Sequence, residues 1–376
     1  MLGGTMAALP RFFVVTCLVV GCLPCAATAA ESNAVPADVA AFQQDISPRV
    51  RAARPMADKH WRQVEPALHH LATQHADCLD SMPQADRIAT LASLTEFIDR
   101  VRAACAARPV LAPGRTVIGL LDPARGLDPK EITTIATAYG GAATVFKQDA
   151  PGETIASVAD DFLAAVRAAA AADTPATIVV LGHGLPTEIQ SYSIRFERLA
   201  AALIDGDSRR NSAAQATPIV DLGRVVLVCD DCFSTDFLIN LCTEIEAECR
   251  RRDHRLVSLP SCIAGTNRDC VGHADVGEKF VPHFWKDVIE LFYVRRPRPE
   301  TVTLGDFFEK VDNMMYGYGR APTVGRDGSV SYRLVDPTQC QDPVVLVPLD
   351  EAELVELRTI LRLPADAPLP RWLDIG

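Results

Sequence analysis

Short apolar runs separated by amphipathic stretches fill the middle of the chain. Apolar residues between two of the runs recur at helical spacing, from Ile155 to Val166. Strands that alternate with helices predict an α/β fold of three layers, in which helices flank a mostly parallel central sheet. The runs predicted to be strands are 116–121, 142–146, 177–182, 225–228 and 255–259.

Capping and turn signals divide the chain further. Asp128 followed by Pro129 predicts a helix start, and Thr303 with Asp306 predicts a capping pair for the next helix. Asp327-Gly328 is typical of a hairpin turn. The segment DEAELVELRTILRL predicts one more helix, so we expect a C-terminal helical extension over 346–376.

The residues before this pattern are predicted to be helical. Apolar positions from Ile88 to Val101 follow helical spacing, and no strand is indicated between about 37 and 108. We expect 31–110 to form a helical accessory region or pro-region. The α/β domain is then expected over 111–345.

The first thirty residues have the pattern of an export signal. Arg11 precedes the apolar stretch FFVVTCLVVGCL, and Ala27-Thr28-Ala29 fits a signal-peptidase site. No segment reaches the roughly twenty apolar residues of a membrane-spanning helix. The mature protein is expected to be secreted or periplasmic, without an integral membrane span. LVVGC loosely resembles a lipoprotein box, which would place a lipid anchor on Cys22.

Cysteine number bears on the chemistry of an exported protein. Of 12 cysteines, those outside the predicted signal are odd in number, so at least one thiol is left over if the others pair. Cys78 and Cys105 would lie at opposite ends of a simple helical hairpin, and pairing them would need a third segment.

Charge excludes some partners. The net charge is −11 and no long basic stretch occurs. We therefore expect neither nucleic acid nor an anionic membrane as the main partner.

Two predicted strands end in residues that could react together. Strand 177–182 runs into His183-Gly184, and strand 225–228 is followed by Cys229-Asp230-Asp231-Cys232. The carboxyl ends of parallel strands meet at one edge of a sheet. A thiolate can attack a carbonyl, an imidazole can transfer the proton, and glycine lets backbone amides approach the oxyanion.

These blocks, TIVVLGHG and VVLVCDDCFS, resemble the catalytic blocks of the caspase-like cysteine peptidases, which include caspases, metacaspases, legumains and gingipains. Asp230-x-Cys232-x-Ser234 is most similar to metacaspases. The resemblance spans about 115–310 and implies an endopeptidase without cofactor or metal that acts on a peptide or protein substrate. It implies His183 as general acid/base, Cys232 as nucleophile, and the amides of Gly184 and Cys232 as oxyanion hole.

The resemblance also implies a specificity. Asp230 matches the metacaspase aspartate that selects arginine or lysine, and Ser234 and Asp269 would join it in binding substrate. Arg268 could instead favour legumain-like cleavage after asparagine or aspartate. Two positions depart from the metacaspase pattern: Phe233 stands where metacaspases usually have histidine, and Thr235 where they have glycine.

Other interpretations stay open. A strand, a C-x-x-C sequence and a helix also fit a thiol–disulfide oxidoreductase that uses Cys229 and Cys232. A zinc site that adds Cys242 and Cys249 is less favoured, because this pair lacks the usual spacing. No G-x-S-x-G of an α/β-hydrolase occurs. An inactive caspase-like scaffold that binds a partner is a further alternative.

Charged residues outside these blocks have simpler interpretations. Asp231 is expected to be a solvated loop carboxylate. Arg209-Arg210 and 249–255 are expected to be exposed charges in loops. If the enzyme prefers basic residues, both segments would be candidate self-processing sites.

Overall fold

The computed structural model describes residues 67–68, 71–72, 74–124, 128–211, 217–265, 300–308, 320–324, 330–334 and 344–375. The predicted signal segment, Cys22, Arg268, Asp269 and the turn at Asp327-Gly328 lie outside these ranges.

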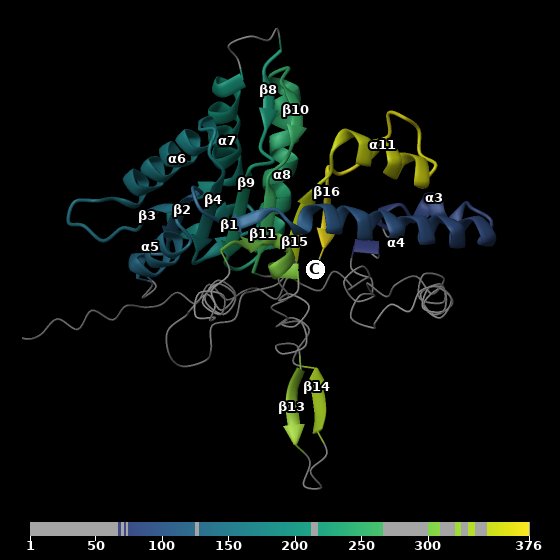
Figure 1. The fold of residues 1–376 in the computed structure, drawn as a ribbon, viewed down its shortest axis with the longest axis horizontal. Helices are drawn as coiled ribbons and strands as arrows, with labels where there is room; N and C mark the ends of the chain where they lie inside the picture. Colours follow the sequence, from purple (N-terminus) through teal and green to yellow (C-terminus); the bar gives the residue numbers. More distant parts are fainter. Residues whose placement is uncertain are drawn as a thin grey trace, which may run out of the picture. The chain divides into compact units, whose positions relative to one another are not determined.

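A seven-stranded mixed sheet forms the centre of the described fold (Figure 1), in the order β16-β15-β11-β9-β4-β2-β3. The strands from β3 to β11 run parallel to one another. Two antiparallel strands, β15 and β16, complete the other edge. The predicted α/β fold with a mostly parallel sheet is confirmed. The strands are β3 (Ala142–Phe146), β2 (Thr116–Leu121), β4 (Ala176–Leu181), β9 (Val225–Asp230), β11 (Ser261–Ala264), β15 (Val344–Pro348) and β16 (Trp372–Ile375).

The fifth predicted strand is not the fifth strand of this sheet. Residues Arg255–Ser258 do form a strand, β10, but it pairs with β8 (Ile219–Asp221) in a separate two-stranded sheet. The place beside β9 belongs to β11. Pro260 separates the two segments, and the run SCIA is too short to stand out by hydrophobicity although all of it is buried.

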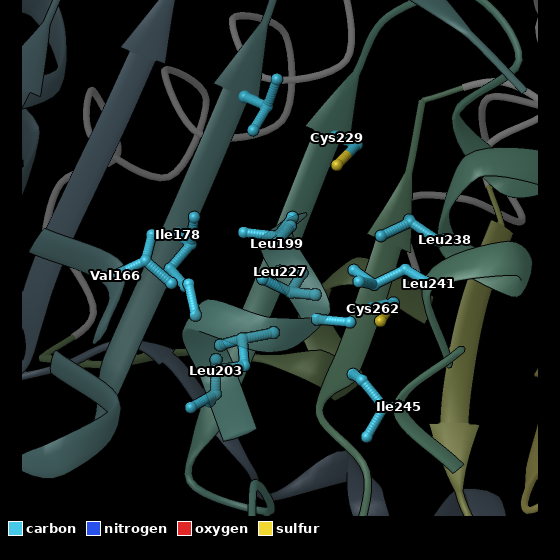
Figure 2. Close-up of a cluster of buried hydrophobic side chains, with 14 of the residues drawn as sticks. Val166, Ile178, Leu199, Leu203, Leu227, Cys229, Leu238, Leu241, Ile245 and Cys262 are labelled. Carbon is cyan, nitrogen blue, oxygen red and sulfur yellow. The ribbon is translucent and has the colours of Figure 1, made fainter. Parts of the chain in front are cut away.

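Helices cover both faces of the sheet. On one face, α6 (Ile155–Ala171), α7 (Phe196–Asn211) and α8 (Ser234–Arg251) pack over the strands and enclose the core cluster of Figure 2. On the other face, α5 (Pro129–Ala138) places Ile132 against Gly119, where an added Cβ would lie 2.9 Å from its Cδ1. The helix–sheet–helix layers agree with the prediction.

Predicted capping signals occur as expected. The Asp128 carboxylate accepts the Lys130 N–H at 2.9 Å at the start of α5. The Asp306 carboxylate accepts the Thr303 N–H at 2.9 Å, and the Thr303 hydroxyl accepts the Asp306 N–H at 3.3 Å. Each contact satisfies an N–H that the first helical turn leaves without a backbone partner.

The C-terminal segment is more than a helical extension. The predicted helix is present as α11 (Glu351–Ile360), yet it lies between β15 and β16, which complete the central sheet. The boundary predicted at 345 therefore cuts through β15. Every residue of β15 is buried, as expected for an apolar strand covered on both faces.

The described part of the helical region belongs to the same compact unit as the sheet. It contains α3 (Ala76–Asp80) and α4 (Gln84–Ala106), and α4 contacts β15 and α11. Next, β1 (Pro109–Leu111) pairs with β12 (Val302–Thr303). The described residues therefore give no boundary between separately packed units near 110.

The predicted hairpin is supported by its strands. β13 (Arg320–Val324) pairs antiparallel with β14 (Val330–Leu334), and Val324 lies opposite Val330. None of the described helices is long and apolar enough to cross a membrane.

A buried ion pair fastens α7 to the start of β9. The Asp207 carboxylate is fully buried, lies 2.8 Å from Arg224 Nη2 and accepts the Asp221 N–H at 2.6 Å. Asp207→Ala should lower the free energy of unfolding in urea by about 3 kcal/mol, because it leaves a largely buried guanidinium without its charge partner. The exposed Asp160, paired with Arg198, provides the control. Asp160→Ala should change stability by less than about 1 kcal/mol, and equal losses in the two variants would contradict the prediction.

Candidate functional site

The two predicted catalytic loops leave the same edge of the sheet. β4 and β9 are parallel neighbours, and Leu181 lies opposite Asp230 in their register. The Gly182 N–H donates to the Asp230 carbonyl at 3.4 Å. His183 and Cys232 therefore follow adjacent strand ends, and each is partly exposed.

Gly184 brings the two loops into contact. A Cβ built on this glycine would lie 2.5 Å from Asp231 Cγ and 2.6 Å from the Cys232 carbonyl oxygen. Real Cβ atoms do not approach other atoms so closely, so only glycine fits here. The structure thus places the Gly184 backbone directly against the loop that carries Cys232.

The His183 loop is also held from its other side. The Gln190 N–H donates to the His183 carbonyl at 3.0 Å, and a small antiparallel sheet, β5 (Gly184–Leu185), β6 (Glu188–Ile189) and β7 (Ile194–Arg195), shapes the chain between His183 and α7. η1 (Gln190–Tyr192) follows β6. The Asn240 side chain on α8 donates to the Pro186 carbonyl at 2.8 Å. The helix that follows Cys232 therefore also holds the His183 loop.

Cys232 lies at the N-terminal end of α8. Phe233, the N-cap residue, has a φ of 56°, a left-handed conformation that costs energy for a bulky residue. The N-terminus of an 18-residue helix favours negative charge nearby. The turn at Phe233 places Cys232 at the edge of the sheet. Ser234, predicted to bind substrate, is fully buried in the first turn of α8 and does not reach the surface with Cys232.

Asp230 lies beneath the end of β11. It is buried, and a Cβ on Gly265 would lie 2.3 Å from its Oδ1. The Gly265 N–H donates to the Cys229 carbonyl at 2.8 Å. The end of β11 is therefore a third component of the site. The sequence pattern instead predicts the strand next to β9 at 255–259.

Asp231 is not the solvated carboxylate that the sequence suggests. It is 2 % exposed, and burial, followed by the neighbouring Asp230, raises the pKa of Asp231 well above its ordinary value. The prediction was wrong because a residue after a strand was assumed to have left the core. Gly184 instead packs against this side chain.

Asp122 is a site neighbour that the sequence analysis did not select. It follows β2 directly, is buried, and accepts the Ser191 hydroxyl at 2.5 Å. A Cβ on Gly182 would lie 2.5 Å from Asp122 Cβ. The loop from Gly182 to Gly184 thus contacts Asp122 at one end and Asp231 at the other. The sequence signal that could have identified Asp122 is its position as a polar residue directly after an apolar strand.

The raised pKa of Asp231 predicts a pH-dependent stability. Above the unfolded-state pKa near 3.8 the unfolded chain releases this proton while the folded protein retains it, so the group opposes folding increasingly as pH rises. Asp231→Asn should therefore raise the melting temperature at pH 7, with a gain that shrinks as pH falls toward 3.8. Thermal denaturation across this range measures it. A pH-independent difference would contradict the assignment.

Cys229 lies in the core. It is 2 % exposed in β9, hydrogen-bonded between β4 and β11, and its side chain belongs to the cluster of Figure 2. Burial, with the added effects of Asp231 and Asp230, raises the pKa of the Cys229 thiol well above its ordinary value. Disulfide exchange needs an accessible thiolate. The position of Cys229 therefore disfavours a redox pair with Cys232.

The less favoured alternative, a zinc site of four cysteines, is not assembled. Cys242 and Cys249 lie two turns apart on α8, roughly 10 Å along its axis. Cys242 instead approaches Cys262 of β11, with 3.9 Å between the sulfurs. Within the described ranges, no group of three or more histidine, cysteine or acidic side chains is placed to hold a metal.

The two basic segments are helical in part, so their assignment to loops was only partly right: 252–254 do form the turn before β10. Arg209-Arg210 lie in the last turn of α7, and 249–251 end α8. Arg252 bonds Asp205 at 2.6 Å and Glu248 at 2.5 Å. Arg209, Arg210 and 249–251 are therefore held in helix, not in extended backbone.

Neither a scan against models of known families nor a search of curated proteins finds a match for this chain.

Proposed function

We propose that this chain is an exported caspase-like cysteine endopeptidase that uses His183 and Cys232. The observation that carries the proposal is the contact of Gly184 with Asp231 and the Cys232 carbonyl, which joins the two loops at one sheet edge. A partly exposed thiol at a helix N-terminus, beside a partly exposed imidazole loop, suits acyl transfer.

Each residue has a distinct role in this proposal. His183 takes the proton of the Cys232 thiol, and the thiolate attacks the scissile carbonyl. The amides of Gly184 and Cys232 stabilise the oxyanion that develops. His183 returns the proton to the leaving amine, and water then hydrolyses the thioester.

Negative charge at the strand ends supports cleavage after arginine or lysine. Asp122 and Asp230 are buried beside the two loops. Carboxylates in a site of low dielectric attract a cationic side chain, and Asp230 lies just below the loop ends. We assign Asp230 the role of selecting the substrate side chain.

Fluorogenic peptides that vary only at the residue before the cleaved bond test the proposal. We expect the mature protein to hydrolyse arginine and lysine substrates and to spare those with asparagine, aspartate or norleucine. Cleavage after asparagine or aspartate alone would overturn the basic specificity. Absence of all cleavage by correctly folded protein would instead favour the binding scaffold.

Thiol labelling tests the division of roles between the cysteines. Iodoacetamide should alkylate Cys232 in the native protein, because it is partly exposed, and spare Cys229, Cys242 and Cys262, which are at most 2 % exposed. Peptide mapping by mass spectrometry gives the result, and urea-unfolded protein is the control. A Cys229–Cys232 disulfide in the mapped peptides would support the oxidoreductase instead.

A further inference from the structure

A second concave site lies on the side of α8 that does not face the sheet. The cleft has a volume of about 800 Å³ and lies between α8, α11 and the segment that leads into β16. None of His183, Cys232 and Asp230 lines it. It is therefore separate from the proposed catalytic site.

Two faces of α8 have different surroundings: one packs against the sheet and the other lines the cleft. Leu238, Leu241 and Ile245 are buried against the sheet. Ile239, Thr243, Glu246 and Arg250 follow one another at steps of four, three and four residues, so they form a neighbouring stripe, and this stripe lines the cleft.

Basic side chains outnumber acidic ones around the cleft. Arg250 of α8, Arg358 of α11 and Arg371 lie against two carboxylates, Glu246 and Asp366. Burial raises the pKa of Glu246, while the Arg371 backbone N–H and the charges of Arg371 and Arg250 act in the opposite direction. The cleft therefore has an excess of positive charge.

The three guanidinium groups differ in how they are engaged. Arg371 Nη2 lies 2.6 Å from a Glu351 carboxylate oxygen, and Arg358 Nε donates to the Ala367 carbonyl at 3.1 Å. The Arg250 side chain is exposed and makes no hydrogen bond or ion pair with any residue in the described part of the chain. Arg250 can thus pair with an incoming anion without losing an existing contact.

Apolar side chains form the rest of the lining. Trp372 and Leu369 are almost fully buried, and Ile239 and Leu354 face them from the two helices. A ligand that fills the cleft would place an apolar body on these side chains and its charge at the arginines. Such a division is typical of small-molecule sites, where apolar walls give affinity and a few polar groups give orientation.

We propose that this cleft binds a small organic anion that combines a carboxylate or phosphate group with an apolar body. Guanidinium groups recognise both anions through paired, charge-assisted hydrogen bonds. The proposal does not depend on peptidase activity, because none of the residues assigned to catalysis lines the cleft.

Isothermal titration calorimetry of the full mature chain tests this with four probes. 3-Phenylpropionate and phenyl phosphate carry both parts of the proposed ligand, 3-phenylpropan-1-ol lacks the charge, and inorganic phosphate lacks the apolar body. We expect saturable binding of at least one of the first two, and binding at least about tenfold weaker for the last two. The tighter of the first two identifies carboxylate or phosphate as the preferred group.

Two adjacent arginines provide a matched pair of variants. Arg250→Gln removes the charge in the cleft and should weaken binding about tenfold, the loss of one charge-assisted contact. Arg251→Gln removes an equal charge that faces Glu244 and Glu248 outside the cleft and should leave binding unchanged. Circular dichroism checks that both fold. Equal effects of the two variants, no saturable binding of either aromatic anion, or equal binding of inorganic phosphate would overturn the proposal.

Discussion

Replacing Cys232 with alanine is expected to lower kcat/KM for an arginine-containing peptide by on the order of 10³-fold or more. The substitution removes the only sulfur in the proposed dyad while leaving the left-handed turn at Phe233 and helix α8 in place. His183 then has no thiol to deprotonate, and the oxyanion hole alone provides a small fraction of the rate. Steady-state hydrolysis with purified variants measures the loss.

Cys78 carries a second half-buried thiol and provides a control for the Cys232 substitution. Cys78 lies in α3, and its sulfur donates to the Leu361 carbonyl at 3.0 Å. It is distant in the sequence from both His183 and Cys232. Cys78→Ser should retain activity within about twofold, since it changes no group in the site. If Cys232→Ala stays active while folded, another residue is the nucleophile, and the proposed mechanism is wrong.

Gly184→Ala is expected to reduce the same rate about 100-fold while leaving most of the fold intact. The new methyl group would lie 2.5 Å from Asp231 Cγ and 2.6 Å from the Cys232 carbonyl. Because the second neighbour is backbone, the two loops must separate by several tenths of an ångström or more. Displacement of catalytic groups by about 1 Å can cost roughly 10² in rate.

Gly223→Ala is the matched control for this loop. Its added Cβ would lie 3.1 Å from the Ser258 hydroxyl, a side-chain end that can rotate, at the start of β9 opposite the site. This variant should keep nearly full activity. Thermal denaturation of both variants separates a local effect from unfolding, and wild-type activity in Gly184→Ala would show that the close approach is not needed for catalysis.

Strong apolar periodicity made most of the sheet predictable. β2 and β3 have the bounds that the sequence indicates, and β4 and β9 differ by only one or two residues at an end. β11 was missed because its run SCIA includes a serine and is not strongly apolar, and β15 because it overlaps the segment predicted to be a helical extension. Their position in the sheet depends on partners distant in the sequence, which no local pattern encodes.

The candidate site was predictable in part for the same reason. Strand order follows from alternation well enough to expect His183 and Cys232 at one edge, and the structure places their loops there. Asp122 and Asp231 were missed because burial at a strand end depends on what packs over it. Asp269 lies outside the described residues, so its role remains a prediction.

The late position of β15 in the chain has a consequence for when the fold can form. Residues through 265 already include the loops that carry His183 and Cys232 and every parallel strand of the central sheet. β11 pairs with β9 on one side, but its other neighbour in the sheet is β15, at residues 344–346. During synthesis, that second edge of β11 therefore stays unpaired until residues 344–346 have been made. We therefore expect nascent chains that stop before β15 to expose this strand edge to chaperones, and the loops that carry His183 and Cys232 to become stably positioned only after β15 has paired.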